Sequence, residues 1–152
     1  MNEAANLVEH IEILCANYLR STGRELITPG TDPVDIVRRL AVAPFAVVSH
    51  GIQDDPIFNY GNNIALELFE MTWNEFTSLP SRLSAEMIDQ FERSRLLDQV
   101  SKQGYIDNYS GIRISKSGRR FMIKDATVWN LIDAEGKYYG QAALIGSWDK
   151  SP

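Results

Sequence analysis

Apolar residues recur at three- and four-residue spacing in the first part of the chain, as expected of amphipathic helices. The stripe of the first predicted helix, residues 3–21, consists of Leu7, Ile11, Leu14 and Tyr18. Gly23 follows in the position favoured for a C-terminal cap. A second, short helix is predicted after the N-cap residue Asp32, because Pro33 fits the first helical position. The sequence Thr28-Pro29-Gly30 predicts a turn between the two helices.

The segment from residue 54 to residue 70 (DDPIFNYGNNIALELFE) joins a strand-like apolar run to an amphipathic helix. We predict a strand at 56–58, a tight turn over 59–62 and a helix from there to residue 70. Gly61 suits such a turn because it has no Cβ to clash at positive φ. Asn62 or Asn63 can then accept a backbone N–H in the first turn of the helix. The other elements are expected to be arranged around this strand–turn–helix unit.

Weaker signals lie on both sides of this unit. An apolar run at 45–48 predicts a strand upstream. Downstream, Thr72 can cap a short helix, and a longer helix is predicted from Ser84 to Gly104. Helices are therefore expected between two early strands and the C-terminal region.

The period of the pattern changes to two in the last third of the chain, which is typical of β-strands. We predict strands at 105–114, 119–132 and 138–148, joined by turns at 115–118 and 133–136. The middle strand is apolar on both faces, with Phe121, Ile123, Trp129 and Leu131 assigned to one and Met122, Ala126 and Val128 to the other. Such a strand belongs to a sheet that is covered on both sides. The middle helices are expected to cover one side, and either the N-terminal helix or a second copy of the chain the other.

These elements define an α+β protein: an antiparallel sheet of about five strands flanked by short helices, with an amphipathic helix at the N-terminus. A chain of 152 residues suits one compact domain. The net charge of −5 disfavours nucleic acid as a partner, because phosphate neutralisation needs a concentrated basic face. No apolar run approaches the ~18 residues that span a bilayer, so no membrane partner is expected. The N-terminus has no basic n-region, so we expect no signal peptide and a cytoplasmic location.

Several short runs carry a resemblance to a known family. They are SH at 49–50, DP at 55–56, FNY at 58–60, ALELFE at 65–70, LPSRLS at 79–84, YSG at 109–111, SGRRF at 117–121, VWN at 128–130 and YGQA at 139–142. In the order of its elements the chain resembles a PAS domain, and in these runs it resembles the PAS-related MEKHLA family, in its stand-alone bacterial or algal type. The resemblance covers residues 32–152 and leaves residues 1–31 as an N-terminal helix and connector. It implies a PAS-like fold with a sensory or regulatory role.

The resemblance to PAS domains raises the question of a flavin or a haem. Flavin photoreceptor domains of this class carry a reactive cysteine on a helix before the long one, but residues 71–87 contain none, so flavin–cysteine chemistry is not expected. Haem-binding members commonly use a histidine on the long helix, and residues 84–104 contain none. His50 alone is a weak metal signal. The single cysteine, Cys15, excludes an internal disulfide and any CxxC metal site. The cofactor is therefore left unknown.

The motifs do not indicate an enzyme. Ser49 and His50 are adjacent, and neighbouring strand residues point to opposite faces, so the two are badly placed to share a proton. The sequence has no GxSxG elbow, P-loop or dinucleotide fingerprint. Asp54 and Asp55, before Pro56, fit an Asx-type turn better than an acid–base pair.

Polar residues set among aromatics are the candidates for a ligand-binding site. They are His50, Asn59, Tyr60, Asn108, Tyr109, Arg113, Trp129 and Asn130. A buried polar group without a partner costs roughly 1–3 kcal/mol. Asn59 and Asn130 could therefore bond loop backbone, or some of the set could orient a ligand between sheet and helices. Trp129, expected on the same face as Phe121 and Ile123, would then form part of the ligand wall.

Two functions remain open. The first is a sensor that binds a small apolar ligand, and the second is a ligand-free protein-interaction or dimerisation module. A ligand-sized cavity between residues 84–104 and the sheet would favour the first, and tight packing there the second. In either case residues 3–21 are expected to pack on the outer face of the sheet and to contribute to a homodimer.

Overall fold

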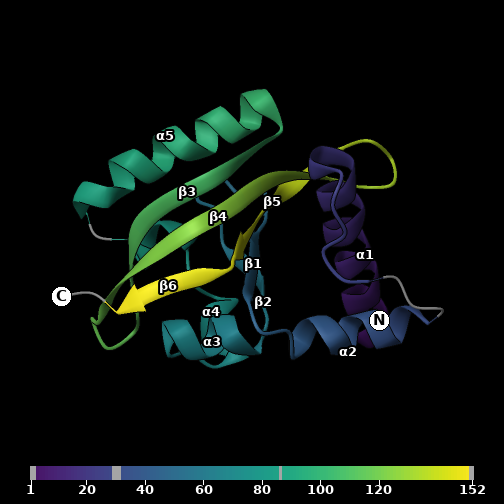
Figure 1. Cartoon of the computed structure of the whole chain (residues 1–152), viewed down its shortest axis with the longest axis horizontal. Helices are drawn as coiled ribbons and strands as arrows, with labels where there is room; N and C mark the ends of the chain where they lie inside the picture. The colour runs from purple at the N-terminus through teal and green to yellow at the C-terminus, as the bar shows by residue number, and fades with distance from the viewer. Residues whose placement is uncertain (1–2, 29–31, 86, 151–152) are drawn as a thin grey trace.

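The computed structural model describes residues 3–28, 32–85 and 87–150, with their side chains apart from those of 3–5, 87–93 and 150. The turn predicted at Pro29-Gly30 lies outside the described residues. The strands are β1 (Ala46–His50), β2 (Phe58–Gly61), β3 (Tyr105–Ile114), β4 (Arg120–Ile132), β5 (Tyr138–Ile145) and β6 (Ser147–Lys150). They form the expected antiparallel sheet, with strand order β2-β1-β5-β4-β3 and with β6 paired to β4 (Figure 1).

The helices agree closely with the hydrophobic pattern. They are α1 (Glu3–Thr22), α2 (Pro33–Ala41), α3 (Asn63–Phe69), α4 (Trp73–Phe76), the 3-10 helix η1 (Ser81–Ser84) and α5 (Met87–Gln103). Asp32 caps α2 and Thr72 caps α4, as predicted. The long helix does not begin at Ser84, however. Ser84 ends η1, and the extended backbone of Ala85 (φ −132°, ψ 151°) prevents the two helices from joining.

One face of the sheet, which we call the α1 face, is covered by the N-terminal helix of the same chain. Ile11, Leu14 and Tyr18 of α1 form a buried cluster with Trp129 and Leu131 of β4. In Figure 1, α1 lies to the right of the strands. The packing of residues 3–21 on this face is therefore confirmed, and a second copy of the chain is not needed to cover it.

The opposite face, which we call the α5 face, is covered by α3, α4 and α5 (Figure 1). Phe69 of α3 and Phe76 of α4 pack against Phe58 and Phe121, with the rings of Phe58 and Phe76 stacked at a centroid distance of 4.2 Å. Leu96 and Val100 of α5 form a smaller cluster with Val128. β4 is thus buried on both faces, as its sequence indicates.

The alternation along β4 is broken at Asp125, and this overturns one prediction. Asp125 has a positive φ of 51°, and the register between β3 and β4 shifts near it, between Tyr109 and Gly111. A β-bulge of this kind inserts a residue and changes which face the following side chains occupy. Phe121 and Ile123 therefore face α3 and α4, whereas Trp129 faces α1. The expectation that Trp129 shares their face is wrong, because simple alternation does not continue through the bulge.

The predicted third strand is interrupted near the same place. It was expected to run over 138–148, but Gly146 separates β5 from β6, and both segments pair with β4. The interruption lies opposite Asp125, since Lys124 pairs with Ser147 and Thr127 pairs with Leu144. The bulge in β4 and the break between β5 and β6 therefore lie opposite each other in the sheet.

The strand–turn–helix unit also differs in one detail. Residues 59–61 belong to β2 rather than to a turn, and Gly61 does not have a positive φ. A Cβ at Gly61 would lie 2.8 Å from the ring of Phe76, so the glycine is needed for close packing of α4. Asn62 is the N-cap of α3: its Oδ1 accepts the N–H groups of Ala65 and Val47 and thereby ties the helix to β1.

Candidate functional site

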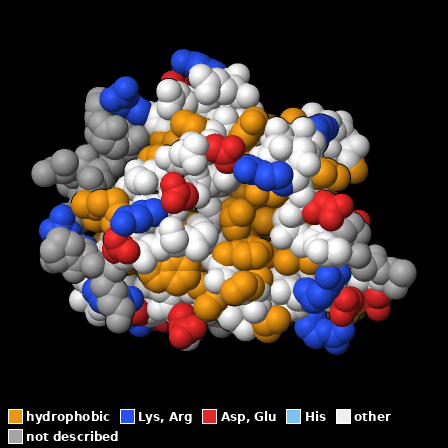
Figure 2. Space-filling view, in the orientation of Figure 1, with side chains coloured by type: hydrophobic (Ala, Val, Ile, Leu, Met, Phe, Trp, Pro, Cys, Tyr) orange, Lys and Arg blue, Asp and Glu red, His pale blue; other side chains and the backbone are white. Residues whose placement is uncertain are grey.

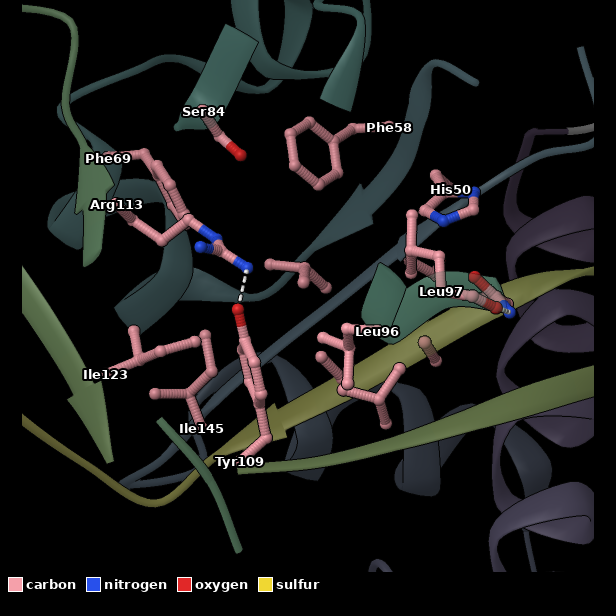
Figure 3. A pocket seen from close by; sticks show the side chains of 16 residues that line it. His50, Phe58, Phe69, Ser84, Leu96, Leu97, Tyr109, Arg113, Ile123 and Ile145 are labelled. Atoms are coloured by element: carbon pink, nitrogen blue, oxygen red, sulfur yellow. Dashed lines mark hydrogen bonds between the residues drawn. The ribbon is translucent and has the colours of Figure 1, made fainter. Parts of the chain in front are cut away.

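A cavity of about 60 Å³ lies on the α5 face, between the sheet and the helices α3, η1 and α5 (Figure 3). Its apolar wall includes Phe58, Phe69, Leu96, Leu97, Ile123 and Ile145. Its polar lining consists of Ser49, His50, Ser84, Tyr109, Arg113 and Gln141. A cavity of about 150 Å³ can hold benzene, so this one has room for roughly two to four non-hydrogen atoms. An apolar cavity with a few polar groups is the usual form of a small-molecule site.

Arg113 and Tyr109 form the polar end of this cavity. Both side chains come from β3, and Arg113 Nη2 donates a hydrogen bond to the Tyr109 hydroxyl at 3.1 Å (Figure 3). A second bond, of 2.9 Å, runs from Arg113 Nη1 to the carbonyl of Ile112. Gly111 lies between the two residues on the same face of the strand. A Cβ there would lie 2.5 Å from Tyr109 Oη and 3.3 Å from Arg113 Nη1, so a larger residue would displace the ends of these two side chains.

The other end of the cavity is formed where β1 and β5 pair through His50 and Gln141. His50 Nδ1 is 3.0 Å from the carbonyl of Gly51, and because a carbonyl only accepts, Nδ1 carries the proton. Gly140 has a φ of 150°, and a Cβ there would lie 2.1 Å from the carbonyl oxygen of His50. The close approach of the two strands therefore requires a glycine at this position.

Gln141 and Asn130 attach α5 to the sheet beside the cavity. Gln141 Nε2 donates to the carbonyl of Leu97 at 3.2 Å and to Asn130 Oδ1 at 3.0 Å. Asn130 Nδ2 donates to the carbonyl of Val100 at 2.8 Å. Asn130 thus bonds backbone rather than lining the cavity. Any movement of Leu97 in response to a ligand would act directly on these bonds.

Three of the candidate residues lie on the α1 face, away from the cavity. Trp129 packs edge-on against Tyr18 at a centroid distance of 4.8 Å and donates to the carbonyl of Leu14 at 3.3 Å. Tyr60 is buried in the same cluster, and burial raises the pKa of its hydroxyl. Asn59 accepts a hydrogen bond from the Ser49 hydroxyl at 2.5 Å. Trp129 is therefore a core residue here and not part of the cavity wall.

Asn108 is also separate from the cavity, because it is exposed in β3. Its positive φ of 58° is of the kind that asparagine tolerates better than most residues. Of the eight candidates, the structure brings together His50, Tyr109 and Arg113. It adds Ser84 and Gln141, which the sequence did not single out because neither stands out from ordinary helix-end and strand positions.

Sequence reasoning also missed His10, which joins a buried polar network on the α1 face. His10 Nε2 lies 2.9 Å from Ser49 Oγ, and Nδ1 lies 2.8 Å from the Tyr139 hydroxyl. Because Ser49 donates its proton to Asn59, His10 must donate from Nε2 and accept at Nδ1. Burial lowers the pKa of His10 to about 4. The only sequence signal was its place on the apolar stripe, between Leu7 and Leu14.

This network does not have the geometry of a nucleophile with its base. A histidine that activates a serine must accept the hydroxyl proton, whereas His10 donates to Ser49. Across residues 3–28, 32–85 and 87–150, no group of three or more His, Cys, Asp or Glu residues could hold a metal ion. None of the helices in those ranges is both long enough and apolar enough to cross a membrane.

The architecture described above, an antiparallel sheet with α3, α4 and α5 on one face and a cavity beneath them, is that of a PAS domain. Solved structures share it at low identity. The PAS domain of a protein from Colwellia psychrerythraea is 14% identical with a TM-score of 0.62, and the match covers 72% of this chain and 91% of that one. The light-state dimer of the fungal blue-light photoreceptor Vivid is 12% identical with a TM-score of 0.60, covering 90% and 93%. The PAS domain of a LuxR-family transcriptional regulator from Burkholderia thailandensis, in complex with ethanol, is 16% identical with a TM-score of 0.55, covering 72% and 94%.

Within this class, the chain belongs to the MEKHLA domain family, whose profile matches residues 8–150. The match begins inside α1, earlier than the resemblance in the sequence suggested. Homeobox-leucine zipper protein ATHB-9 of Arabidopsis thaliana is 28% identical over 96 residues, which are 61% of this chain and 11% of that protein. Homeobox-leucine zipper protein HOX29 of Oryza sativa subsp. indica is 25% identical over 140 residues, 88% of this chain and 16% of that protein. The chain thus spans less than a fifth of either relative.

The cavity does not fit a flavin. Its volume of about 60 Å³ is smaller than the roughly 150 Å³ that accommodates a single benzene ring, and a flavin has three fused rings. Cys15 lies on α1, on the opposite side of the sheet. Burial and the nearby Glu12 raise the pKa of its thiol to about 11, which keeps it protonated at neutral pH.

Proposed function

We propose that this domain is a PAS-type sensor module that binds a small, largely apolar molecule in the cavity of the α5 face, and that it is not an enzyme. The observation that carries the proposal is the lining of that cavity. Its apolar wall is drawn from both the sheet and the helices, and its polar groups converge from β1, β3, β5 and η1. This composition is suited to binding and orienting a ligand rather than to chemistry.

The position of α5 supplies a route from ligand binding to a signal. Leu96 and Leu97 of α5 line the cavity directly, while Gln141 and Asn130 hold the backbone of the same helix to β5 and β4. A ligand that moves Leu97 would strain or relax these bonds. The structure of a PAS domain in complex with ethanol supports a ligand of very few atoms in this fold.

The proposal is tested by native mass spectrometry of the purified chain together with a metabolite thermal-shift screen. A ligand at about 100 times its Kd should raise stability by about 2.7 kcal/mol. For a chain of this size, each kcal/mol corresponds to roughly 2–4 °C in melting temperature. Retained mass or a clear shift is expected. Empty spectra and a screen without hits would instead support the interaction module.

The alternative, a ligand-free interaction or dimerisation module, draws support from the small size of the cavity and from exposed apolar residues. Leu19 of α1 is 48% exposed, Val34 of α2 is 58% exposed, and Val42 at the end of α2 is 67% exposed. Figure 2 shows hydrophobic side chains gathered in the middle of one face and surrounded by charged ones. The light-state dimer of Vivid is an example of self-association in this fold.

We propose that the chain forms a homodimer through the exposed side of α1, since the buried side is occupied by its own sheet. Light scattering should then give a dimer mass for the full chain and a monomer mass for Leu19→Glu, with unchanged circular dichroism. The matched control is Ile52→Glu, at a 63% exposed position in the loop after β1. A monomer mass for the unaltered chain would contradict the proposed dimer.

The composition of the chain predicts neither nucleic acid nor a membrane as a further partner.

A further inference from the structure

The cavity of the α5 face contains a buried cation whose hydrogen-bond partners among the described residues are all neutral. Arg113 is 8% exposed, and its guanidinium bonds the Tyr109 hydroxyl and the carbonyl of Ile112. Within the described part of the chain, no carboxylate forms an ion pair with Arg113. By contrast, Arg24 and Arg38, which form ion pairs with Asp107 and Asp35, have largely exposed side chains.

A buried charge of this kind is costly unless it is paired. Removing an ionised group from water costs several kcal/mol, and neutral hydrogen-bond acceptors recover only part of this. A guanidinium has five N–H donors in a planar fork, and two are accounted for by Tyr109 and Ile112. Donors therefore remain for an acceptor that carries the missing negative charge.

The Tyr109 hydroxyl provides a second donor beside the first. Because it accepts from Arg113 Nη2, its own proton is available for another acceptor. Figure 3 shows both groups at the edge of the cavity, with the hydroxyl directed toward the guanidinium and the apolar side chains of Leu96 and Ile123 nearby. Two adjacent donors, one of them cationic and planar, match the two oxygens of a carboxylate.

We infer that the ligand of this cavity is a short-chain monocarboxylate, held at its carboxylate by Arg113 and Tyr109 with its alkyl group against Leu96, Leu97 and Phe58. This inference rests on the proposed function and specifies its ligand class. The head group follows from the charge of Arg113. The short chain follows from the volume of about 60 Å³ and from the apolar wall. A large or multiply charged anion does not fit this combination.

The test uses the full chain with sodium acetate and sodium propionate, each compared by calorimetry and thermal shift with sodium chloride at equal ionic strength. Propanamide and 1-propanol serve as neutral molecules of similar size. The unaltered protein should bind at least one carboxylate and bind the neutral molecules about tenfold or more weakly. Binding of propanol or propanamide as tight as that of propionate would overturn the carboxylate assignment and leave the small-molecule site intact.

Three variants separate the role of Arg113 from a general effect of charge. Arg113→Met keeps an unbranched side chain but removes the guanidinium and its charge, and it should weaken carboxylate binding by about ten- to a hundredfold. Tyr109→Phe should weaken it by about three- to tenfold. Arg38→Met, which removes an exposed arginine of α2, is the matched control and should bind as the unaltered chain does.

Folding of each variant is checked by circular dichroism, and Arg113→Lys is measured as well, because it keeps the positive charge while losing the planar fork. Weaker binding in Arg113→Lys supports the bidentate geometry. Unchanged carboxylate affinity in both Arg113 variants would overturn the inference. If no carboxylate and no neutral molecule of the wider screen binds at all, the proposed sensor function fails together with it.

Discussion

The two faces of the sheet differ in how their buried polar groups are satisfied. On the α1 face, His10, Ser49, Asn59 and Tyr139 bond one another. On the α5 face, Arg113 bonds a hydroxyl and a carbonyl and has no carboxylate partner in the part of the chain that the structure describes, and a cavity lies beside it. A face whose polar groups are paired internally is a structural core. A face that keeps a cavity and a charge beside neutral groups is the one for which we propose a ligand.

The largest expected effect is the loss of core packing on the α1 face. Trp129→Ala removes a fully buried side chain between β4 and α1 and should lower the free energy of unfolding by about 3–5 kcal/mol. Chemical denaturation of the two proteins measures this difference in the free energy of unfolding. Trp73→Ala, at a 40% exposed position on α4, is the control and should cost much less. A loss of ligand binding in a Trp129→Ala protein that still folds would show that the two faces are not independent.

The second effect concerns pH and the same face. The pKa of His10 is about 4 in the folded chain, against 6.5 for the free side chain. Between these values the unfolded chain takes up a proton that the folded chain excludes. Stability is therefore complete above pH 6.5 and decreases as the pH falls toward 4, by roughly 3 kcal/mol.

The measurement is the free energy of unfolding at half-unit steps from pH 7 to pH 4, for the unaltered chain and for His10→Gln. The variant should lack most of the decrease. Glu70, whose pKa is lowered to about 2 by hydrogen bonds from Ser115 and Ser117, loses its contribution as the pH falls from about 4.5 to 2, mostly below this window. If the free energy of unfolding depends on pH in the same way in both proteins, His10 is not the cause of the decrease in stability.

A smaller effect is expected from Gly111→Ala on the α5 face. The new Cβ would meet Tyr109 Oη at 2.5 Å, so the tyrosine must move and its bond to Arg113 must break or lengthen. Overpacking of this kind costs about 1–3 kcal/mol. Gly146→Ala is a matched control, because nothing lies within 4 Å of the added atom and Gly146 has no positive φ. Equal melting temperatures for the two variants would contradict the close packing over Gly111.

The smallest effect on stability, with a clear effect on binding, is expected from Ala143→Val. Ala143 lines the cavity, and two added carbons would occupy part of its volume of about 60 Å³. Filling an empty space should change the free energy of unfolding by less than about 1 kcal/mol. Any ligand-induced rise in melting temperature should nevertheless be lost. If the rise in melting temperature persists, the ligand binds outside this cavity, and the α5 face does not differ from the α1 face in the way proposed.

Local residue chemistry was enough to predict most elements of this chain. Asp32 and Thr72 begin helices because their side chains accept backbone N–H groups, and this needs no information about the rest of the fold. The alternation of residues 105–132 predicted paired strands, and the apolar residues on both faces of β4 predicted two layers of helices. Of the candidate site, the sequence supplied His50, Tyr109 and Arg113 but not the pairing of the last two over Gly111.

Only the tertiary structure decided which residues distant in sequence contact one another and which face of the sheet each side chain occupies. The bulge at Asp125 determines that Trp129 faces α1 rather than the cavity, and a single shift of this kind reverses every later side chain. Gly61 and Gly111 are needed because of Phe76 and Tyr109, which approach them through space. His10 meets Ser49 only because α1 folds back over β1. The sequence by itself determined the period, the caps and the α+β class, because these depend on neighbouring residues, whereas the faces and the cavity depend on packing across the chain.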